Sequence, residues 1–217
     1  MLILTFSAER PDALEWWTPA GRLVAVATIL EKQKPGSLDA PSNDPQSGAM
    51  IGTRIEVAGA DGSPIATTVR TLKPTKPPTY VDAPNGQRLV SVAQEKVFSK
   101  IASYAVTAPN GAPIGRLVAT DMRGKAVVLS DNSGGQLATV VKYGKWDGAN
   151  VALEFSRNRP FQTPTEWLAS RAAPALFPIK RERVCSVVIR DRPPADASQA
   201  LLGFLAPLLL EHTLSIL

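Results

Sequence analysis

Two side chains of this sequence are of a type that could act as a nucleophile or a general base. They are the single cysteine, Cys185, and the single histidine, His212. Cys185 lies in the apolar run VCSVVI, where a thiol behaves as a small hydrophobic side chain, although Arg181 and Arg183 share its strand parity. His212 follows Glu211, but adjacent residues on a helix do not face one another. We therefore expect both side chains to have a structural role in packing and not a catalytic one.

The common catalytic and metal-binding motifs need residues that the sequence lacks. A Ser-His-Asp triad, a zinc site or a disulfide framework needs more His or Cys, or needs the single His within the site. There is no HExxH, CxxC or EF-hand spacing, and Gly134-Gly135 lacks the helix and lysine of a phosphate loop. The carboxylates are scattered singly, so no glycosidase pair can be identified. We expect a protein that is not an enzyme and uses no cofactor or metal.

Basic side chains are the remaining candidates for a binding site. Long basic side chains on exposed segments attract phosphate, either in lipid head groups or in nucleic acid. The candidates are Lys73, Lys76, Arg157, Arg159, Lys180, Arg181, Arg183, Arg190 and Arg192. The last five border one predicted strand, but Glu182 and Asp191 interrupt them. An ordinary solvated face therefore stands as the alternative to an anion-binding surface.

Length and composition bound the fold. The 217 residues carry a net charge of +5, and 44% of them are hydrophobic. A chain of this length can bury a sizeable core without disulfides, so we expect a single domain over residues 1–217. The 15 glycines and 19 prolines predict many short elements joined by turns. The N-terminal MLILTF has no basic region before it and no cleavage site after it, so we do not expect a signal peptide.

A hairpin pattern recurs along the chain. In each copy an apolar strand leads into a turn that contains glycine, and a second apolar strand follows. The clearest copies are 56–70, 80–94, 104–120 and 127–142, and looser ones are 16–30 and 142–155. Turn dipeptides such as Asn85-Gly86 suit the positive φ that tight hairpins need. Six such hairpins predict an antiparallel meander of ten to twelve strands.

Tyrosines and loops mark the ends of these predicted strands. Tyr80, Tyr104 and Tyr143 flank strands, and we expect them to close barrel ends with their hydroxyls in water. Residues 33–49 carry three prolines and no apolar periodicity, which predicts a long mobile loop that is too polar to pack. Residues 71–79 (TLKPTKPPT) predict a second extended connection, with a PxxP-type ligand as the alternative.

The C-terminal segment is apolar on every side. Residues 200–210 (ALLGFLAPLLL) contain no polar side chain, so a helix here must be buried in protein or in lipid. Asp196 or Ser198 is expected to cap its start. Eleven residues rise only about 16 Å, half of the ~30 Å hydrocarbon core of a bilayer. We therefore expect residues 196–217 to form a central helix inside the barrel, with a membrane anchor as the alternative.

Three hairpin segments and the apolar C-terminal segment carry a resemblance. They are 104–106 (YAV), 110–115 (NGAPIG), 129–140 and 200–210, and the similarity extends over residues 50–217. Together they resemble the tubby C-terminal-like superfamily, within it the phospholipid scramblase and LURP-one-related branch. The resemblance implies a twelve-stranded barrel threaded by a hydrophobic helix, and binding of phosphoinositide head groups through basic surface residues. The sequence lacks the acidic cluster and the Cys-rich stretch of scramblases, so neither calcium binding nor lipid translocation is expected.

The sequence thus predicts a mainly β fold, a closed antiparallel barrel around a buried C-terminal helix. The function we expect is a non-enzymatic module that recognises anionic phospholipid head groups. It would be cytoplasmic and act at the periphery of a membrane. The alternative is a structural or protein-interaction scaffold with no small-molecule ligand, with residues 33–49 as its contact. An anionic lipid or a protein is a better partner for this sequence than nucleic acid.

Overall fold

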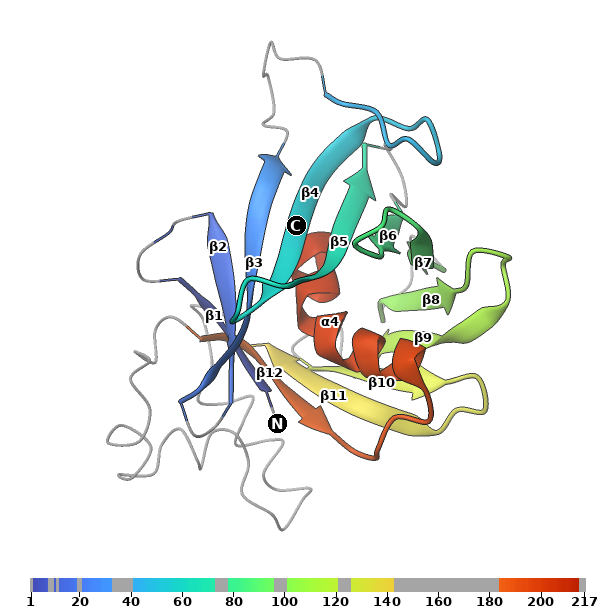
Figure 1. Cartoon of the computed structure of the whole chain (residues 1–217). Coiled ribbons are helices and arrows are strands. Elements are labelled where there is room, and N and C mark those ends of the chain that lie inside the picture. The colour runs from blue at the N-terminus through green and yellow to red at the C-terminus, as the bar shows by residue number, and fades with distance from the viewer. Residues whose placement is uncertain are drawn as a thin grey trace.

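The chain forms a closed antiparallel barrel of twelve strands around a C-terminal helix (Figure 1). This computed structural model describes residues 2–7, 10, 12–18, 21–32, 41–72, 78–95, 101–120, 126–142 and 184–214. The strands are β1 Leu2–Phe6, β2 Ala13–Trp17, β3 Leu23–Lys32, β4 Ile51–Gly59, β5 Pro64–Thr71, β6 Thr79–Asp82, β7 Arg88–Gln94, β8 Ser103–Thr107, β9 Pro113–Ala119, β10 Ala126–Asp131, β11 Gln136–Lys142 and β12 Val184–Arg190. The helix α4 spans Ala197–Leu214.

Each strand pairs with its neighbour in the sequence, and β1 closes the barrel by pairing with β12. The β1–β12 register places Ile3 opposite Val187. Closure leaves none of the twelve described strands with a free edge that could pair with another chain. The predicted closed barrel is therefore confirmed, at the upper end of the expected strand number.

Five tight turns share one geometry. In each, a backbone N–H donates to the carbonyl four residues later, as Ala83 does to Gln87 at 2.8 Å. The fourth residue of each turn is a glycine with φ between 76° and 83°, at Gly21, Gly62, Gly86, Gly111 and Gly134. Residues with a Cβ rarely adopt this conformation, which explains the regular spacing of glycine along the chain. The hairpin prediction is confirmed for the described residues; the proposed hairpin at 142–155 lies outside them from residue 143 onward.

Alternate residues of each strand face the interior of the barrel. Residues that pair across neighbouring strands share a face, so Leu129, Leu117 and Tyr104 form one inward row. All three belong to the buried core, and Tyr104 is only 4% exposed. The expectation that Tyr104 closes a barrel end with a wetted hydroxyl is therefore wrong, because its strand register turns the ring inward. Tyr80 is half-buried, and Tyr143 lies outside the described residues.

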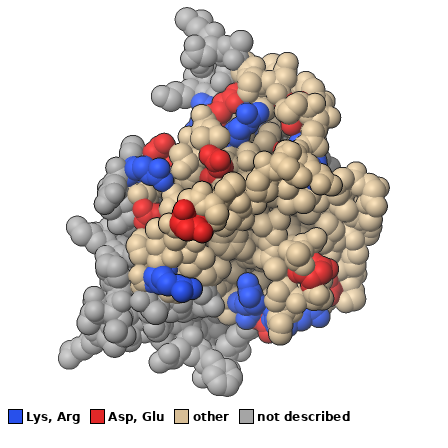
Figure 2. All heavy atoms as spheres, viewed as in Figure 1, with Lys and Arg blue, Asp and Glu red and all other residues tan. Residues whose placement is uncertain are grey.

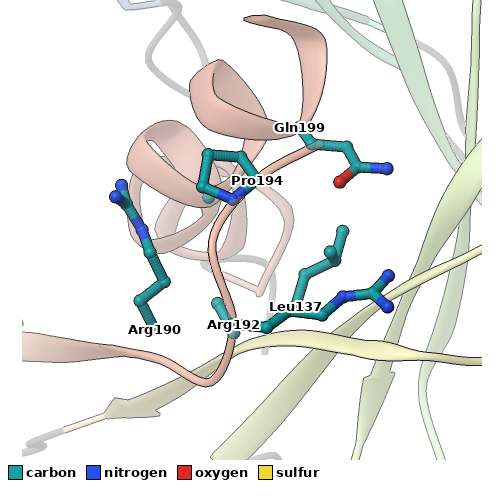
Figure 3. Close-up of a pocket in the computed structure, with 7 residues that line it drawn as sticks. Leu137, Arg190, Arg192, Pro194 and Gln199 are labelled. Carbon is teal, nitrogen blue, oxygen red and sulfur yellow. The ribbon is translucent and has the colours of Figure 1, made fainter. Parts of the chain in front are cut away.

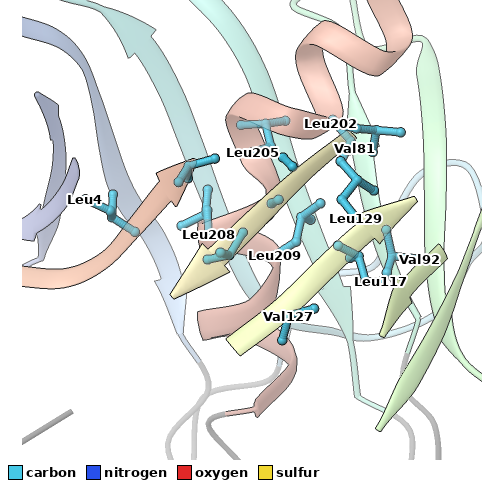
Figure 4. Close-up of a cluster of buried hydrophobic side chains, with 14 of the residues drawn as sticks. Leu4, Val81, Val92, Leu117, Val127, Leu129, Leu202, Leu205, Leu208 and Leu209 are labelled. Atoms are coloured by element: carbon cyan, nitrogen blue, oxygen red, sulfur yellow. The ribbon is translucent and has the colours of Figure 1, made fainter. Parts of the chain in front are cut away.

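The helix α4 fills the barrel. Its leucines Leu202, Leu205, Leu208 and Leu209 are at most 2% exposed and pack among strand residues such as Leu117 and Leu129 (Figure 4). The ring of Phe204 stacks on Trp16 of β2 with the centroids 5.0 Å apart. Asp196 caps the helix, since its carboxylate accepts the N–H of Gln199 at 2.8 Å. A helix with apolar residues on all sides is thereby buried in protein, as the sequence predicts.

Residues 41–49 differ from the expected unpacked loop. Asn43 bridges to Met50, and the Asp44 side chain is fully buried. The turn closes through the N–H of Gly48, which donates to the Asp44 carbonyl at 2.8 Å. The expectation that the whole of 33–49 is too polar to pack is therefore wrong for 41–49, because the polar groups of this part find partners within the fold. Residues 33–40 lie outside the described residues.

We expect the stability of the fold to depend strongly on α4. Leu205→Ala should lower the free energy of unfolding by about 2–5 kcal/mol, since it leaves a cavity at a fully buried site. Urea denaturation followed by circular dichroism would measure the change. The matched control is Leu30→Ala, at a side chain that is 56% exposed, where the change should be within about 0.5 kcal/mol. Equal effects at the two positions would contradict the central position of α4.

Two glycines give opposite expectations for a single added methyl group. A Cβ on Gly203, inside α4, meets no atom within 4 Å, so Gly203→Ala should stabilise the protein by about 0.5–1 kcal/mol through helix propensity. A Cβ on Gly115 of β9 would lie 2.2 Å from the carbonyl oxygen of Ser130, so Gly115→Ala should destabilise by about 1–3 kcal/mol. Thermal melts of both variants would test this packing, and a lower melting temperature for Gly203→Ala would contradict it.

Candidate functional site

The two ends of the barrel are built differently. In an antiparallel meander, successive connections alternate between the ends. The end that we call the turn end holds the five tight turns and the segment 191–196, which leads from β12 into α4. The other end, which we call the linker end, holds the connections 7–12, 33–50, 72–78, 95–102, 120–125 and 143–183. The strand order therefore fixes where each long connection begins and ends, and the described part of one of them, 41–49, reaches the turn 83–87 through the hydrogen bond from Gln46 to the carbonyl of Gly86.

Charge follows this division. By sequence, the six linker-end connections contain 15 Lys and Arg and 10 Asp and Glu, a net charge of +5. The turn-end connections contain 2 basic and 3 acidic residues, a net charge of −1. On the face shown in Figure 2, acidic and basic side chains of the described residues alternate without forming a patch of one sign. The positive excess of the protein thus belongs to connections that leave one end of the barrel.

The strand order divides the nine predicted basic candidates. Arg190 and Arg192 lie at the turn end, where β12 leads into α4. The other seven, Lys73, Lys76, Arg157, Arg159, Lys180, Arg181 and Arg183, belong to linker-end connections and lie outside the described residues. Since β12 runs the length of the barrel wall, Arg190 and the basic residues that precede the strand belong to opposite ends. The basic residues before and after β12 therefore do not form a single basic patch.

Arg192 at the turn end is held by an acidic partner. Its guanidinium forms an ion pair with Asp131 and covers Gly135, where a Cβ would lie 2.8 Å from a guanidinium nitrogen. The Ser133 hydroxyl, the Gly135 N–H and Arg192 together lower the pKa of Asp131 to about 2. The charge of Arg192 is thus offset by a carboxylate that stays ionised near neutral pH.

The recess beside these arginines is too small for a ligand of ordinary size. It is lined by Leu137, Ala138, Arg190, Arg192, Pro194, Gln199 and Gly203, and its volume is about 10 Å³, room for a single water. In Figure 3 the side chains of Arg190 and Arg192 diverge rather than converge on a common point. The two arginines therefore do not form a joint anion site.

The linker end exposes apolar side chains. Among the described residues the large hydrophobic side chains that are exposed are Leu30 (56%), Met50 (52%), Leu72 (42%) and Ile101 (42%). Each lies within three residues of a strand terminus at the linker end, on β3, β4, β5 and β8 respectively. No motif in the sequence marks these four side chains as a group. The available signal was Leu72 beside two lysines and three prolines in TLKPTKPPT, an apolar residue at the start of a polar connection.

A buried cation lies on the inner face of the barrel near the linker end. Arg70 pairs with Thr79, two residues before the inward Val81, and is 8% exposed. The hydroxyls of Thr68 and Thr79 are buried there without a hydrogen-bond partner among the described residues. Burial lowers the pKa of Arg70 and raises the pKa of Tyr104, because removal from water disfavours the charged form of each side chain. This polar lining lies toward the linker end, the end toward which α4 runs from its start after β12.

A buried ion-pair cluster holds residues 41–49 against the barrel. The Arg88 guanidinium contacts Asp44 at 3.1 Å and Asp82 at 3.0 Å, and it lies 3.6 Å from the centroid of the Tyr80 ring. Gln46 also donates to the carbonyl of Gly86 at 2.6 Å. Burial alone would raise the pKa of Asp44, but hydrogen bonds from Ser47 and Arg88 outweigh it and lower that pKa. The carboxylates are thus engaged by side chains of the fold itself, and the cluster acts as a structural clamp.

Apart from this clamp, the described residues were compared with the requirements of a metal site, a reactive side chain and a membrane-spanning helix. They contain no group of three His, Cys, Asp or Glu side chains placed to hold a metal ion. The side chains of Cys185 and His212 are not among those described, although their backbones lie in β12 and α4. A search of the same residues for a helix both long and apolar enough to cross a membrane finds none.

Comparison of the chain with protein-family models, with curated proteins and with solved structures gives no match. The resemblance to the tubby C-terminal-like superfamily therefore stays a prediction. The closed twelve-stranded barrel with a helix inside agrees with the fold that this resemblance implies, but a shared architecture does not identify a family or an activity.

The clamp predicts a pH-dependent loss of stability. Arg88→Met should cost about 3–5 kcal/mol near neutral pH, because it leaves the Asp44 carboxylate buried without its partner. Since the pKa of Asp44 is below its usual 3.8 in the folded protein, its contribution is present above about pH 4 and is lost as the pH falls further. The difference between wild type and variant should therefore shrink at about pH 3. Urea midpoints at the two pH values would measure it, with Arg22→Met, at an exposed site, as the control.

Proposed function

We propose that this protein is a non-enzymatic module that binds anionic phospholipid surfaces through its linker end. The observation that carries the proposal is the asymmetry of the barrel. The connections that begin and end at the linker end carry a net charge of +5 by sequence, and all four exposed large apolar side chains of the described residues lie near that end. A basic surface with apolar side chains is the combination that peripheral membrane proteins use.

The excess of Lys and Arg in the linker-end connections would orient the protein with this end toward an anionic surface. A Lys or Arg close to such a surface contributes about 1 kcal/mol, and the attraction fades beyond a Debye length of about 10 Å. A strand of seven residues such as β12 spans about 23 Å at 3.3 Å per residue. Charges at the turn end of a bound molecule would therefore be screened, and only the linker end would contribute.

The interior of the barrel favours surface binding over an enclosed ligand. The helix α4 occupies the space that a lipocalin-like barrel would use for a small molecule. The recess at its start holds about 10 Å³. A head group would thus meet the protein at the linker end, where phosphoinositides are the anionic lipids that the tubby resemblance implies.

Vesicle binding tests the proposal. The wild-type protein should pellet with phosphatidylcholine vesicles that contain phosphatidylserine or a phosphoinositide, at low salt, and should not pellet with phosphatidylcholine alone. Lys73→Glu/Lys76→Glu reverses two linker-end charges and should weaken binding about tenfold or more.

Arg22→Glu/Arg190→Glu is the matched control. It changes the net charge by the same amount at exposed turn-end positions, and it should change vesicle affinity little. Failure of the wild-type protein to pellet with anionic vesicles would reject the proposal. A protein-interaction scaffold would instead bind a protein partner, and the charge of added lipid would not affect that binding.

A further inference from the structure

Met50 and Leu72 form an exposed apolar pair at the tip of the β4–β5 wall. The N–H of Leu72 donates to the carbonyl of Met50 at 2.8 Å, so the two backbones continue the ladder of their strands by one more step. The Leu72 side chain leans over Gly52, where an added Cβ would lie 3.0 Å from a Leu72 methyl carbon. The pair is held by backbone hydrogen bonds and yet is 52% and 42% exposed.

The pair is fixed from its other side as well. Asn43 bridges to Met50, and the Ile51 N–H donates to the carbonyl of Ser42 at 2.8 Å. The segment that supplies these contacts is clamped by the Asp44–Arg88 ion pair. Two exposed apolar side chains therefore stand on a backbone that is hydrogen-bonded on both flanks, so contact with an apolar partner would cost little ordering entropy.

Two further exposed apolar side chains lie on the same end of the barrel but apart from this pair. Leu30 lies at the irregularity where the β3–β4 register shifts, and Ile101 lies two residues before β8. β3 adjoins β4, whereas β8 is separated from β5 by β6 and β7, so the exposed apolar side chains are spread along the rim and do not form the single compact patch typical of a protein interface. A fluid and laterally extended partner can contact all of them at once.

We propose that Met50 and Leu72 insert into the interfacial layer of a lipid bilayer, with Leu30 and Ile101 as flanking contacts. The inference rests on the proposed function, and it adds that binding is apolar as well as electrostatic. The charge of the linker-end connections selects an anionic lipid surface over an uncharged apolar one. Burial of the two side chains among acyl chains and head groups then supplies attraction that salt does not screen.

Insertion can be measured directly at Leu72. The variant Leu72→Cys, in a Cys185→Ala background, is labelled with an environment-sensitive fluorophore and mixed with vesicles of phosphatidylcholine and phosphatidylserine. We expect a blue shift and quenching by bromine-labelled acyl chains. The same label at Ala60→Cys, an exposed position in the tight turn at the opposite end of the β4–β5 hairpin, should show neither effect.

Affinity gives an independent measure. Met50→Ser/Leu72→Ser leaves the net charge unchanged and alters exposed side chains, so the variant should fold normally by circular dichroism. Its vesicle affinity should fall about tenfold, with the same dependence on salt concentration as the wild type. The matched gain variant Ala60→Leu adds an exposed leucine in the turn at the opposite end of the β4–β5 hairpin and should not raise affinity.

The outcomes separate this inference from the proposed function. If wild-type protein binds anionic vesicles but the serine variant binds equally well and the label at position 72 stays in water, insertion is wrong and electrostatic binding stands. If the wild-type protein does not bind vesicles at all, both are wrong. If the serine variant instead abolishes a concentration-dependent self-association seen by light scattering, with no effect on lipid binding, the occupant of this surface is a second copy of the chain.

Discussion

The fold depends on one requirement, that the interior of a closed twelve-stranded barrel be filled. A sheet that closes on itself satisfies its backbone hydrogen bonds but encloses more space than the side chains of its own wall can fill. The helix α4 resolves this with leucines that are almost completely buried on every side and with the stack of Phe204 on Trp16. The inward rows of the strands, and the small size of the recess beside α4, follow from this one packing arrangement.

The same requirement separates the roles of the two ends. At the turn end the chain is committed to five tight glycine turns and to the capped start of α4, which leaves little freedom for surface chemistry. At the linker end the connections vary in length, carry the positive charge of the protein, and adjoin the exposed side chains of Met50 and Leu72. The tight turns and the capped start of α4 thus lie at one end of the barrel, and the longer connections join the strands at the other.

The features with a local cause could be predicted from the sequence. Glycine spacing predicted the hairpins because positive φ is a property of single residues, and the apolar run 200–210 predicted burial because its composition admits no wet face. Features that depend on distant partners could not be predicted. The burial of Asp44 needs Arg88, and the inward turn of Tyr104 is set by the register with Leu117. Likewise, the basic residues along β12 form one group in the sequence, yet the strand assigns them to opposite ends of the barrel.

The pairing of β1 with β12 has a consequence for how the protein is made. The two strands are separated by nearly the whole chain, so the first strand has no partner on one edge until the last strand has left the ribosome. The helix that fills the interior follows still later. During synthesis the nascent sheet is therefore an open, curved surface with an unfilled apolar face, and long-range closure of this kind is slow. We expect the growing chain to need protection from aggregation until β12 and α4 have both been synthesised.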